Sequence, residues 1–232
     1  RNNFIEAMEW LINNDANVNH VDWRQRTPIF SAIQENRIEA VKLLIKKGAN
    51  LEHTNDRNET PLAYAARLNN ADVMQVLKAA QEAQQQQIKE LQAKFFSAAY
   101  KNDSEAMQLL LDQGAKVDHQ DDVGQTALFV AARNNCIEAM EWLIKNDANV
   151  NHENRSGRTP IFSAVYRNRV EAVKLLIKKG ANLEHMNDDN ETPLDYATKF
   201  KKAAAMQVLK STQDAQQQPA AAEIWHEYFS MQ

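Results

Sequence analysis

Histidine is the residue type in this chain with the most obvious capacity for chemistry, because five of the six histidines occupy one repeated position. His20 and His53 are separated by the length of one repeat, and His53 and His119 by twice that length. His119, His152 and His185 then follow one another at the single interval. Such a series could bind a row of metal ions. Neighbouring helices in a packed stack lie ~8–10 Å apart, however, which is too far for adjacent imidazoles to share a zinc ion at bonds of ~2 Å. We therefore predict a structural role for the series and no metal site.

The sequence lacks the motifs of catalysis and of cofactor binding. It has five glycines and one cysteine, and it contains no glycine-rich phosphate loop, nucleophile elbow or Cys/His pair. His226 and Glu227 lack the second histidine of a metalloprotease helix. We expect no enzyme activity, no cofactor and no small-molecule substrate.

The composition argues against two further classes of partner. The 232 residues include 27 basic and 31 acidic side chains, a net charge of −4, so no strong field favours nucleic acid or an anionic membrane. No apolar run approaches the length of a membrane span. The single cysteine, Cys136, excludes an internal disulfide and is typical of a reducing compartment. We expect no nucleic-acid or membrane binding and a cytoplasmic location.

A short phrase marks the elements that must position these residues. It recurs at the interval from Thr27 to Thr60 or at twice that interval: Thr27-Pro28-Ile29-Phe30, Thr60-Pro61-Leu62, Thr126-Ala127-Leu128, Thr159-Pro160-Ile161-Phe162 and Thr192-Pro193-Leu194. A fixed period of about 33 residues indicates a solenoid, in which each repeat buries its apolar face only against its neighbours. Such a protein presents an extended surface rather than a deep pocket.

Each repeat reads as two helices and a loop. Thr27 is a good N-cap, and Pro28 fits the first turn of a helix. We predict that this helix ends at a left-handed asparagine, Asn36, and that a second helix ends at Gly48. Equivalent asparagines are Asn3, Asn69, Asn102, Asn135 and Asn168, and Lys201 breaks the series.

This order of elements resembles the ankyrin-repeat family over nearly the whole chain. The resemblance implies an all-α repeat solenoid: an L-shaped stack of helix pairs with short β-hairpins. It also implies recognition of partner proteins through the hairpin tips and the concave face of the first helices. One departure concerns the histidine that follows Thr-Pro-Leu in the family. Its place is taken by Phe30, Ala63, Phe129, Phe162 and Asp195, so stabilisation of the helix start by that imidazole is absent.

A larger duplication lies above the single repeat. Shifting the sequence by four repeats, so that Arg1 meets Arg133, aligns 1–88 with 133–220 without a gap, and 62 of 88 positions are identical. From Asn36 to His53 only Ile38 and its counterpart Val170 differ, whereas 21–25 is replaced throughout by 153–157. Stacking residues are kept and residues expected at the surface are changed.

The period loses its hairpin at a glutamine-rich stretch. Residues 81–92 contain no glycine or proline, and we predict a long helix from about Asp72 to Tyr100, with a disordered linker as the alternative. The chain then divides into a first array at 1–80, a helical junction at 81–92, a second array of four repeats at 93–217 and a tail at 218–232. The tail is predicted to begin a further block or to form a helical cap.

Candidate binding residues lie at the hairpin tips and just before the turn between the helices of a repeat. Trp23 has the character of an interface anchor, although packing on the neighbouring hairpin is an alternative. Between the duplicated blocks Gln34 becomes Tyr166 and Glu35 becomes Arg167. These changes indicate either that the blocks contact different partners or that exposed positions have varied freely. The full set is Trp23, Arg24, Gln34, Glu35, Leu68, Tyr100, Arg155, Tyr166, Arg167 and Phe200. By contrast, we expect Trp10 and Trp142 to pack.

The hypothesis is a non-enzymatic scaffold that binds partner proteins. The alternative is a targeting or substrate-recruiting segment of a larger enzyme or secreted effector, with the catalytic domain outside this chain. The Asn/Lys/Gln-rich composition is similar to that of ankyrin arrays from intracellular bacteria and some protists. If the protein is a secreted effector, its location would be the host cytosol.

Overall fold

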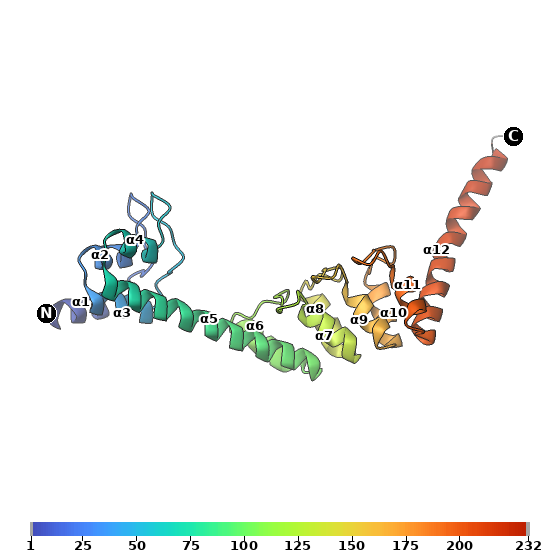
Figure 1. Ribbon diagram of the computed structural model, residues 1–232, viewed down its shortest axis with the longest axis horizontal. Coiled ribbons are helices and arrows are strands. Elements are labelled where there is room, and N and C mark those ends of the chain that lie inside the picture. The colour runs from blue at the N-terminus through green and yellow to red at the C-terminus, as the bar shows by residue number, and fades with distance from the viewer. Residues whose placement is uncertain (1, 231–232) are drawn as a thin grey trace. The chain divides into compact units, whose positions relative to one another are not determined.

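The protein is built from helices joined by short turns and long loops. A computed structural model describes residues 2–230, with side chains described for 4–216. Figure 1 shows the elements in order: α1 (Asn2–Asn13), α2 (Pro28–Gln34), α3 (Ile38–Lys46), α4 (Pro61–Arg67), α5 (Ala71–Tyr100), α6 (Ser104–Asp112), α7 (Ala127–Asn134), α8 (Ile137–Lys145), α9 (Pro160–Tyr166), α10 (Val170–Lys178), α11 (Pro193–Lys199) and α12 (Ala203–Ser230). Among these described helices, none is long and apolar enough to cross a membrane.

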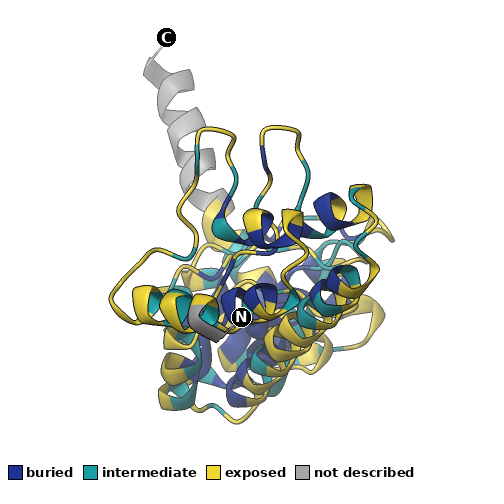
Figure 2. Ribbon diagram, turned by 90° about the vertical axis from the view of Figure 1, so that its left-hand side faces the viewer, coloured by how far each residue is buried: buried dark blue, intermediate teal, exposed yellow. Residues whose placement is uncertain are grey.

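The chain divides into two compact lobes. The first lobe covers residues 1–88 and the second covers 89–232. Each has its own apolar core, formed where the buried faces of its helices meet, while the loop tips remain exposed (Figure 2). Fully buried Phe30, Ile33 and Leu44 belong to the first core, and Phe129 and Phe162 belong to the second. The all-helical repeat solenoid predicted from the sequence is confirmed.

The left-handed turns lie where the asparagines predict them. Asn36 has φ 50° and Lys201, which replaces asparagine in the last repeat, has φ 52°. Asparagine tolerates this conformation best among residues with a Cβ, so the series reflects a backbone requirement. The prediction is wrong for Asn3, which lies inside α1.

Asparagines of these turns also join successive repeats. The Asn102 side-chain oxygen accepts a hydrogen bond from the Ala139 N–H (2.9 Å), and Asn135 and Asn168 make the equivalent bonds one repeat further on. Each bond satisfies a backbone donor in the first turn of the next second helix. Each of these three asparagines therefore forms the left-handed turn of its own repeat and also bonds to the second helix of the next repeat.

The threonine before each first helix is used in two ways. Thr60 and Thr192 accept a hydrogen bond from the backbone three residues on, and Thr192 forms a capping box with Asp195. Three other threonine hydroxyls are buried without a partner among the described residues: Thr27, Thr126 and Thr159. In those three repeats a buried phenylalanine follows three residues later, and its side chain has no hydrogen-bonding group to offer.

The hairpins differ from the expectation, because no segment among residues 2–230 forms a β-strand. Each turn closes on itself, as in the bond from the Asp22 N–H to the Arg26 carbonyl (2.9 Å). Successive tips are joined by single backbone bonds, such as Asp56 N–H to Arg24 carbonyl (3.0 Å) and Arg155 N–H to Val123 carbonyl (3.1 Å). One bond between neighbours is too few to form a ladder.

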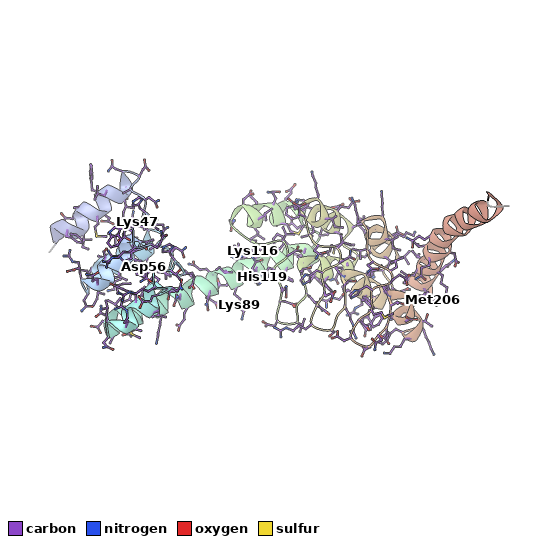
Figure 3. All side chains as sticks on the ribbon, turned by 90° about the horizontal axis from the view of Figure 1, so that it is seen from above. Lys47, Asp56, Lys89, Lys116, His119 and Met206 are labelled. Atoms are coloured by element: carbon purple, nitrogen blue, oxygen red, sulfur yellow. The ribbon has the colours of Figure 1, made fainter. Side chains whose placement is uncertain are left out.

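The predicted junction helix is present as α5, which runs from Ala71 through the glutamines to Tyr100. Its buried Gln92 takes the place of a missing hairpin. With its amide oxygen toward the Lys116 N–H (2.7 Å) and its nitrogen toward the Lys116 carbonyl (3.3 Å), Gln92 pairs with the backbone of that loop residue. Figure 3 labels Lys116 and nearby His119, whose ring packs against Phe96 of α5 with 6.5 Å between centroids. The boundaries proposed for the two arrays remain predictions.

The last helix, α12, follows the second lobe's final repeat. Its buried residues Ala205 and Leu209 join the core of that lobe. The side chains of 217–232 lie outside the described residues, and so does the predicted role of 218–232 as a cap or as the start of another block.

Candidate protein-binding surface

Three of the five repeated histidines tie their hairpin to the one before it. Nε2 lies 2.7 Å from the Gln25 carbonyl in His53, 3.2 Å from the Gly124 carbonyl in His152 and 2.7 Å from the Gly157 carbonyl in His185. The acceptor in each case is the left-handed residue of the preceding tip. Among the described residues, no three His, Cys, Asp or Glu side chains are grouped so that they could hold a metal ion. The observed contacts give His53, His152 and His185 a structural role.

A hollow of about 520 Å³ lies between hairpin tips and first helices of the first lobe; we call it the first hollow. Its lining is Trp23, Arg24, Arg26, Gln34, Asn55, Asp56, Arg57, Tyr64, Arg67 and Leu68. Trp23 is 80% exposed, and the Arg24 guanidinium carbon lies 4.3 Å from the centroid of its ring. An exposed indole next to a cation is a typical interface anchor.

Two of the arginines in the first hollow are already paired within the chain. Arg26 donates to one carboxylate oxygen of Asp22 from Nε (3.0 Å) and Nη2 (2.8 Å), and its Nη1 donates to the Gln34 amide oxygen (3.3 Å). Hydrogen bonds from the Arg26 backbone N–H and guanidinium hold the pKa of Asp22 below its usual value. Arg67 donates to Glu59 at 2.6 Å. Two of the four arginines therefore already hold an internal carboxylate.

The equivalent position in the second lobe carries a hollow of about 360 Å³, which we call the second hollow. Its lining is Gln125, Arg133, Asn154, Arg158, Phe162, Ser163, Tyr166, Arg167, Tyr196 and Phe200. The hollow spans the first helices α7, α9 and α11, of which α7 and α9, and α9 and α11, are neighbours (Figure 1).

Aromatic rings form the wall of the second hollow. The ring centroids of Tyr196 and Phe200 are 4.6 Å apart, and those of Tyr166 and Phe200 are 5.5 Å apart with their planes nearly perpendicular. Tyr196 is buried, which raises the pKa of its hydroxyl. Tyr166 and Phe200 remain 43% and 38% exposed. This is an apolar surface held in shape by ring packing and open to solvent.

The cations of the second hollow have fewer internal carboxylate partners than those of the first. Three arginines, Arg133, Arg158 and Arg167, line it together with no acidic residue. Among the described residues, Arg133 and Arg167 form no ion pair, and Arg158 reaches Asp189 at 3.3 Å through Nη2 while its buried Nε has no partner. The second hollow therefore contains guanidinium donors without acceptors in the described part of the chain, and a net positive charge.

One hairpin turn explains why Arg158 lacks the carboxylate partner that Arg26 has. In each of the five hairpin turns the Oδ1 atom of the turn residue accepts from the backbone N–H of the residue four positions on: Asp22 and Arg26, Asn55 and Glu59, Asp121 and Gln125, Asn154 and Arg158, and Asn187 and Glu191. The Asn154 Oδ1 accepts from the Ser156 and Arg158 backbone N–H groups, so its remaining group is the amide nitrogen. Asn154 therefore lacks the second carboxylate oxygen with which Asp22 accepts from its arginine, and the Arg158 guanidinium can only donate.

The structure divides the sequence-predicted residues into two groups by their place. Trp23, Arg24, Gln34 and Leu68 line the first hollow, and Tyr166, Arg167 and Phe200 line the second. The others line neither hollow: Glu35, which follows α2, Tyr100, at the end of α5 and 59% exposed, and Arg155, at a hairpin tip.

Sequence reasoning missed Arg133, Asn154, Arg158 and Tyr196. A signal was present in the duplication, because position 22 changes from Asp to Asn while the arginine four residues later is kept. Trp142 packs as expected, with its ring centroid 6.2 Å from that of Phe95. The expectation was wrong for Trp10, which is 65% exposed.

The comparisons with known proteins agree with this architecture. No curated protein matches the chain. The family model of ankyrin repeats, described as three copies, matches residues 1–89, 95–187 and 148–219. Ankyrin repeats are generally protein–protein interaction modules and are typically non-catalytic. The repeated helix pairs, their left-handed turns and this match over most of the chain together place the protein in the ankyrin-repeat family.

Proposed function

We propose that this chain is a non-enzymatic scaffold that binds partner proteins through its two hollows and the hairpin tips beside them. The observation that carries the proposal is the second hollow, where exposed Tyr166 and Phe200 adjoin three arginines. Aromatic and arginine side chains are the residue types that most often dominate interface energetics. A family that generally binds proteins supports this interpretation.

The first hollow supplies a second contact of different chemistry. Trp23 offers a large exposed ring next to Arg24, whereas its aligned residue in the second lobe is Arg155. The two lobes would therefore bind different partners, or different parts of one. Cys136 is a buried free thiol whose pKa is raised by burial; we place the protein in a reducing compartment such as the cytoplasm.

A selection of random peptides displayed on phage tests the proposal. The full chain is the bait, and the recovered peptides are measured against the wild type and the double variant Tyr166→Ala/Phe200→Ala. We expect peptides that use the second hollow to lose tenfold or more in affinity, because both rings are exposed anchors. Peptides that use the first hollow are identified with Trp23→Ala.

Trp10→Ala is the control, since Trp10 is an exposed aromatic residue that lines neither hollow. It should leave binding unchanged. Recovery of no binding peptide, or of peptides indifferent to all the hollow variants, would contradict the proposed function.

A further inference from the structure

We infer that the second hollow binds a carboxylate side chain of a partner protein at Arg158, carried next to an apolar side chain, and that Arg26, the counterpart of Arg158 in the first hollow, does not. This inference rests on the proposed function and names the chemistry of the partner. Its basis is a comparison between two copies of the same structure, one of which already contains a carboxylate.

The first lobe shows how this fold binds a carboxylate. One oxygen of Asp22 accepts from the turn backbone, at Arg24 (2.8 Å) and Arg26 (2.9 Å), while the other accepts from Nε and Nη2 of Arg26. The second interaction is a charge-assisted pair of bonds to a planar guanidinium. Asp22 thus occupies Arg26 from within the chain.

The second lobe keeps the arginine and removes both acceptors. Asn154 replaces the Asp22 carboxylate, and Tyr166 replaces the Gln34 amide that accepts from Arg26 and Tyr64. The guanidinium carbon of Arg158 lies 5.0 Å from the centroid of the Tyr196 ring. Its side chain makes one long hydrogen bond, from Nη2 to Asp189. An arginine donor without an acceptor is costly, and an incoming carboxylate would supply the acceptor.

The surrounding charge favours an anion. Arg167 stands where the first lobe has Glu35, and its guanidinium carbon lies 5.8 Å from the Tyr166 ring centroid. Two acidic residues near Arg158 offset part of its charge: Asp189 accepts one bond from its Nη2, and Glu191 accepts from Lys199 and Asn187. Arg133 and Arg167 form no ion pair among the described residues. Three like charges in one hollow repel each other, and an anion relieves that repulsion.

The walls and size of the hollow narrow the ligand further. A volume of about 360 Å³ is at the small end of ordinary ligand pockets, with room for a few side chains rather than a folded element. The exposed parts of Tyr166 and Phe200 provide an apolar contact beside the cations. An acidic side chain with an apolar neighbour in an extended segment fits both features.

The experiment transfers residues between the two lobes in the full chain. The probe is a fluorescein-labelled, C-terminally amidated ten-residue peptide with a Glu-Leu-Glu centre in Gly/Ser flanks, followed by fluorescence anisotropy. We expect it to bind the wild type about tenfold better than the same peptide with Gln-Leu-Gln. Asn154→Asp should weaken binding about tenfold, because the new carboxylate would occupy Arg158 as Asp22 occupies Arg26.

Asn154→Asp is expected to fold, because the Oδ1 turn bonds of Asn154 and Asp22 are the same. Arg167→Glu, which also installs the first lobe's residue, provides a second test by charge reversal and should weaken binding at least as much. Asp22→Asn is the control; it should not weaken binding and should add a second site by releasing Arg26.

Three results would overturn the inference. The first is equal binding of the Glu and Gln peptides by the wild type, or no binding of either. The second is unchanged binding of the Glu peptide by both Asn154→Asp and Arg167→Glu. The third is tighter binding of a ten-nucleotide oligothymidine or of a phosphoserine peptide than of the Glu peptide. In each case the phage selection still tests the proposed function separately, which fails if no peptide is recovered or if the recovered peptides are indifferent to the hollow variants.

Discussion

A single carboxylate oxygen of Asp22 accepts hydrogen bonds from both Nε and Nη2 of Arg26, at 3.0 and 2.8 Å. In the duplicated copy the arginine is retained as Arg158 and the carboxylate becomes the amide of Asn154. Arg26 is therefore held by an internal carboxylate through two bonds, whereas Arg158 keeps a single bond to Asp189 and a buried Nε without a partner among the described residues. Because the residues from Arg26 to Ala32 are unchanged between the copies and those from Asn36 to His53 differ at one position, each copy serves as a control for the other.

The buried threonine hydroxyls give a first prediction. Thr159→Val should leave stability unchanged or raise it by up to about 1 kcal/mol, because the hydroxyl it removes is buried without a partner. Thr192→Val should lower stability by about 1 kcal/mol, because it removes a capping box with Asp195. Urea unfolding followed by circular dichroism compares the two, and equal losses would show that the Thr159 hydroxyl is satisfied in solution.

The glutamine that replaces a hairpin gives a second prediction. Gln92→Ala should destabilise the second lobe by about 1–3 kcal/mol, because it leaves the Lys116 N–H and carbonyl without their buried partner. Gln84→Ala, an exposed change in the same helix, should alter stability by less than about 0.5 kcal/mol. Amide hydrogen exchange at Lys116 should accelerate only in the Gln92 variant. Unchanged exchange there would contradict the pairing.

The histidine series gives a third prediction. His185→Ala should lower the free energy of unfolding by about 1 kcal/mol. The change removes the hydrogen bond between Nε2 and the Gly157 carbonyl and the packing of the ring on Phe162, with 6.3 Å between the ring centroids. His20→Ala is the control, since His20 is exposed and makes no such bond among the described residues. Thermal unfolding of both variants in the presence of excess chelator separates the structural role from metal binding. A loss that appears only on chelation in the wild type would instead favour a metal.

Acid pH gives a fourth prediction. Hydrogen bonds from Lys199 and Asn187 lower the pKa of Glu191 below its ordinary value of 4.5, and those from Thr192 lower the pKa of Asp195 below 3.8. A carboxyl whose pKa is lower in the folded state stabilises it fully above the unfolded pKa and loses that contribution as the pH falls through the folded value. The urea midpoint should therefore be flat above about pH 5 and fall toward pH 3.

Glu191→Gln tests the assignment, because it removes one of these carboxylates. Its midpoint should be lower than that of the wild type at pH 7, and the two should converge toward pH 3. A wild-type midpoint that rises on acidification would refute the assigned direction.

Much of the fold could be predicted from the sequence because its determinants are local. A left-handed turn needs asparagine or glycine at a set position, and a helix start needs threonine and proline, so both recur visibly from one repeat to the next. The junction helix could also be predicted, since the glutamine stretch lacks the glycine and proline residues that end helices. Strand pairing was not, because it depends on how many bonds neighbouring tips exchange in space.

The sequence by itself determined the repeat, the duplication and the positions that changed between its copies. Only the tertiary structure decided which of those changes act together. Asn154, Arg158, Tyr166 and Phe200 come from three different segments of the chain and meet only when successive repeats stack. Whether a cation is satisfied depends on the atoms that face it across that stack, and periodicity along the chain carries no information about them.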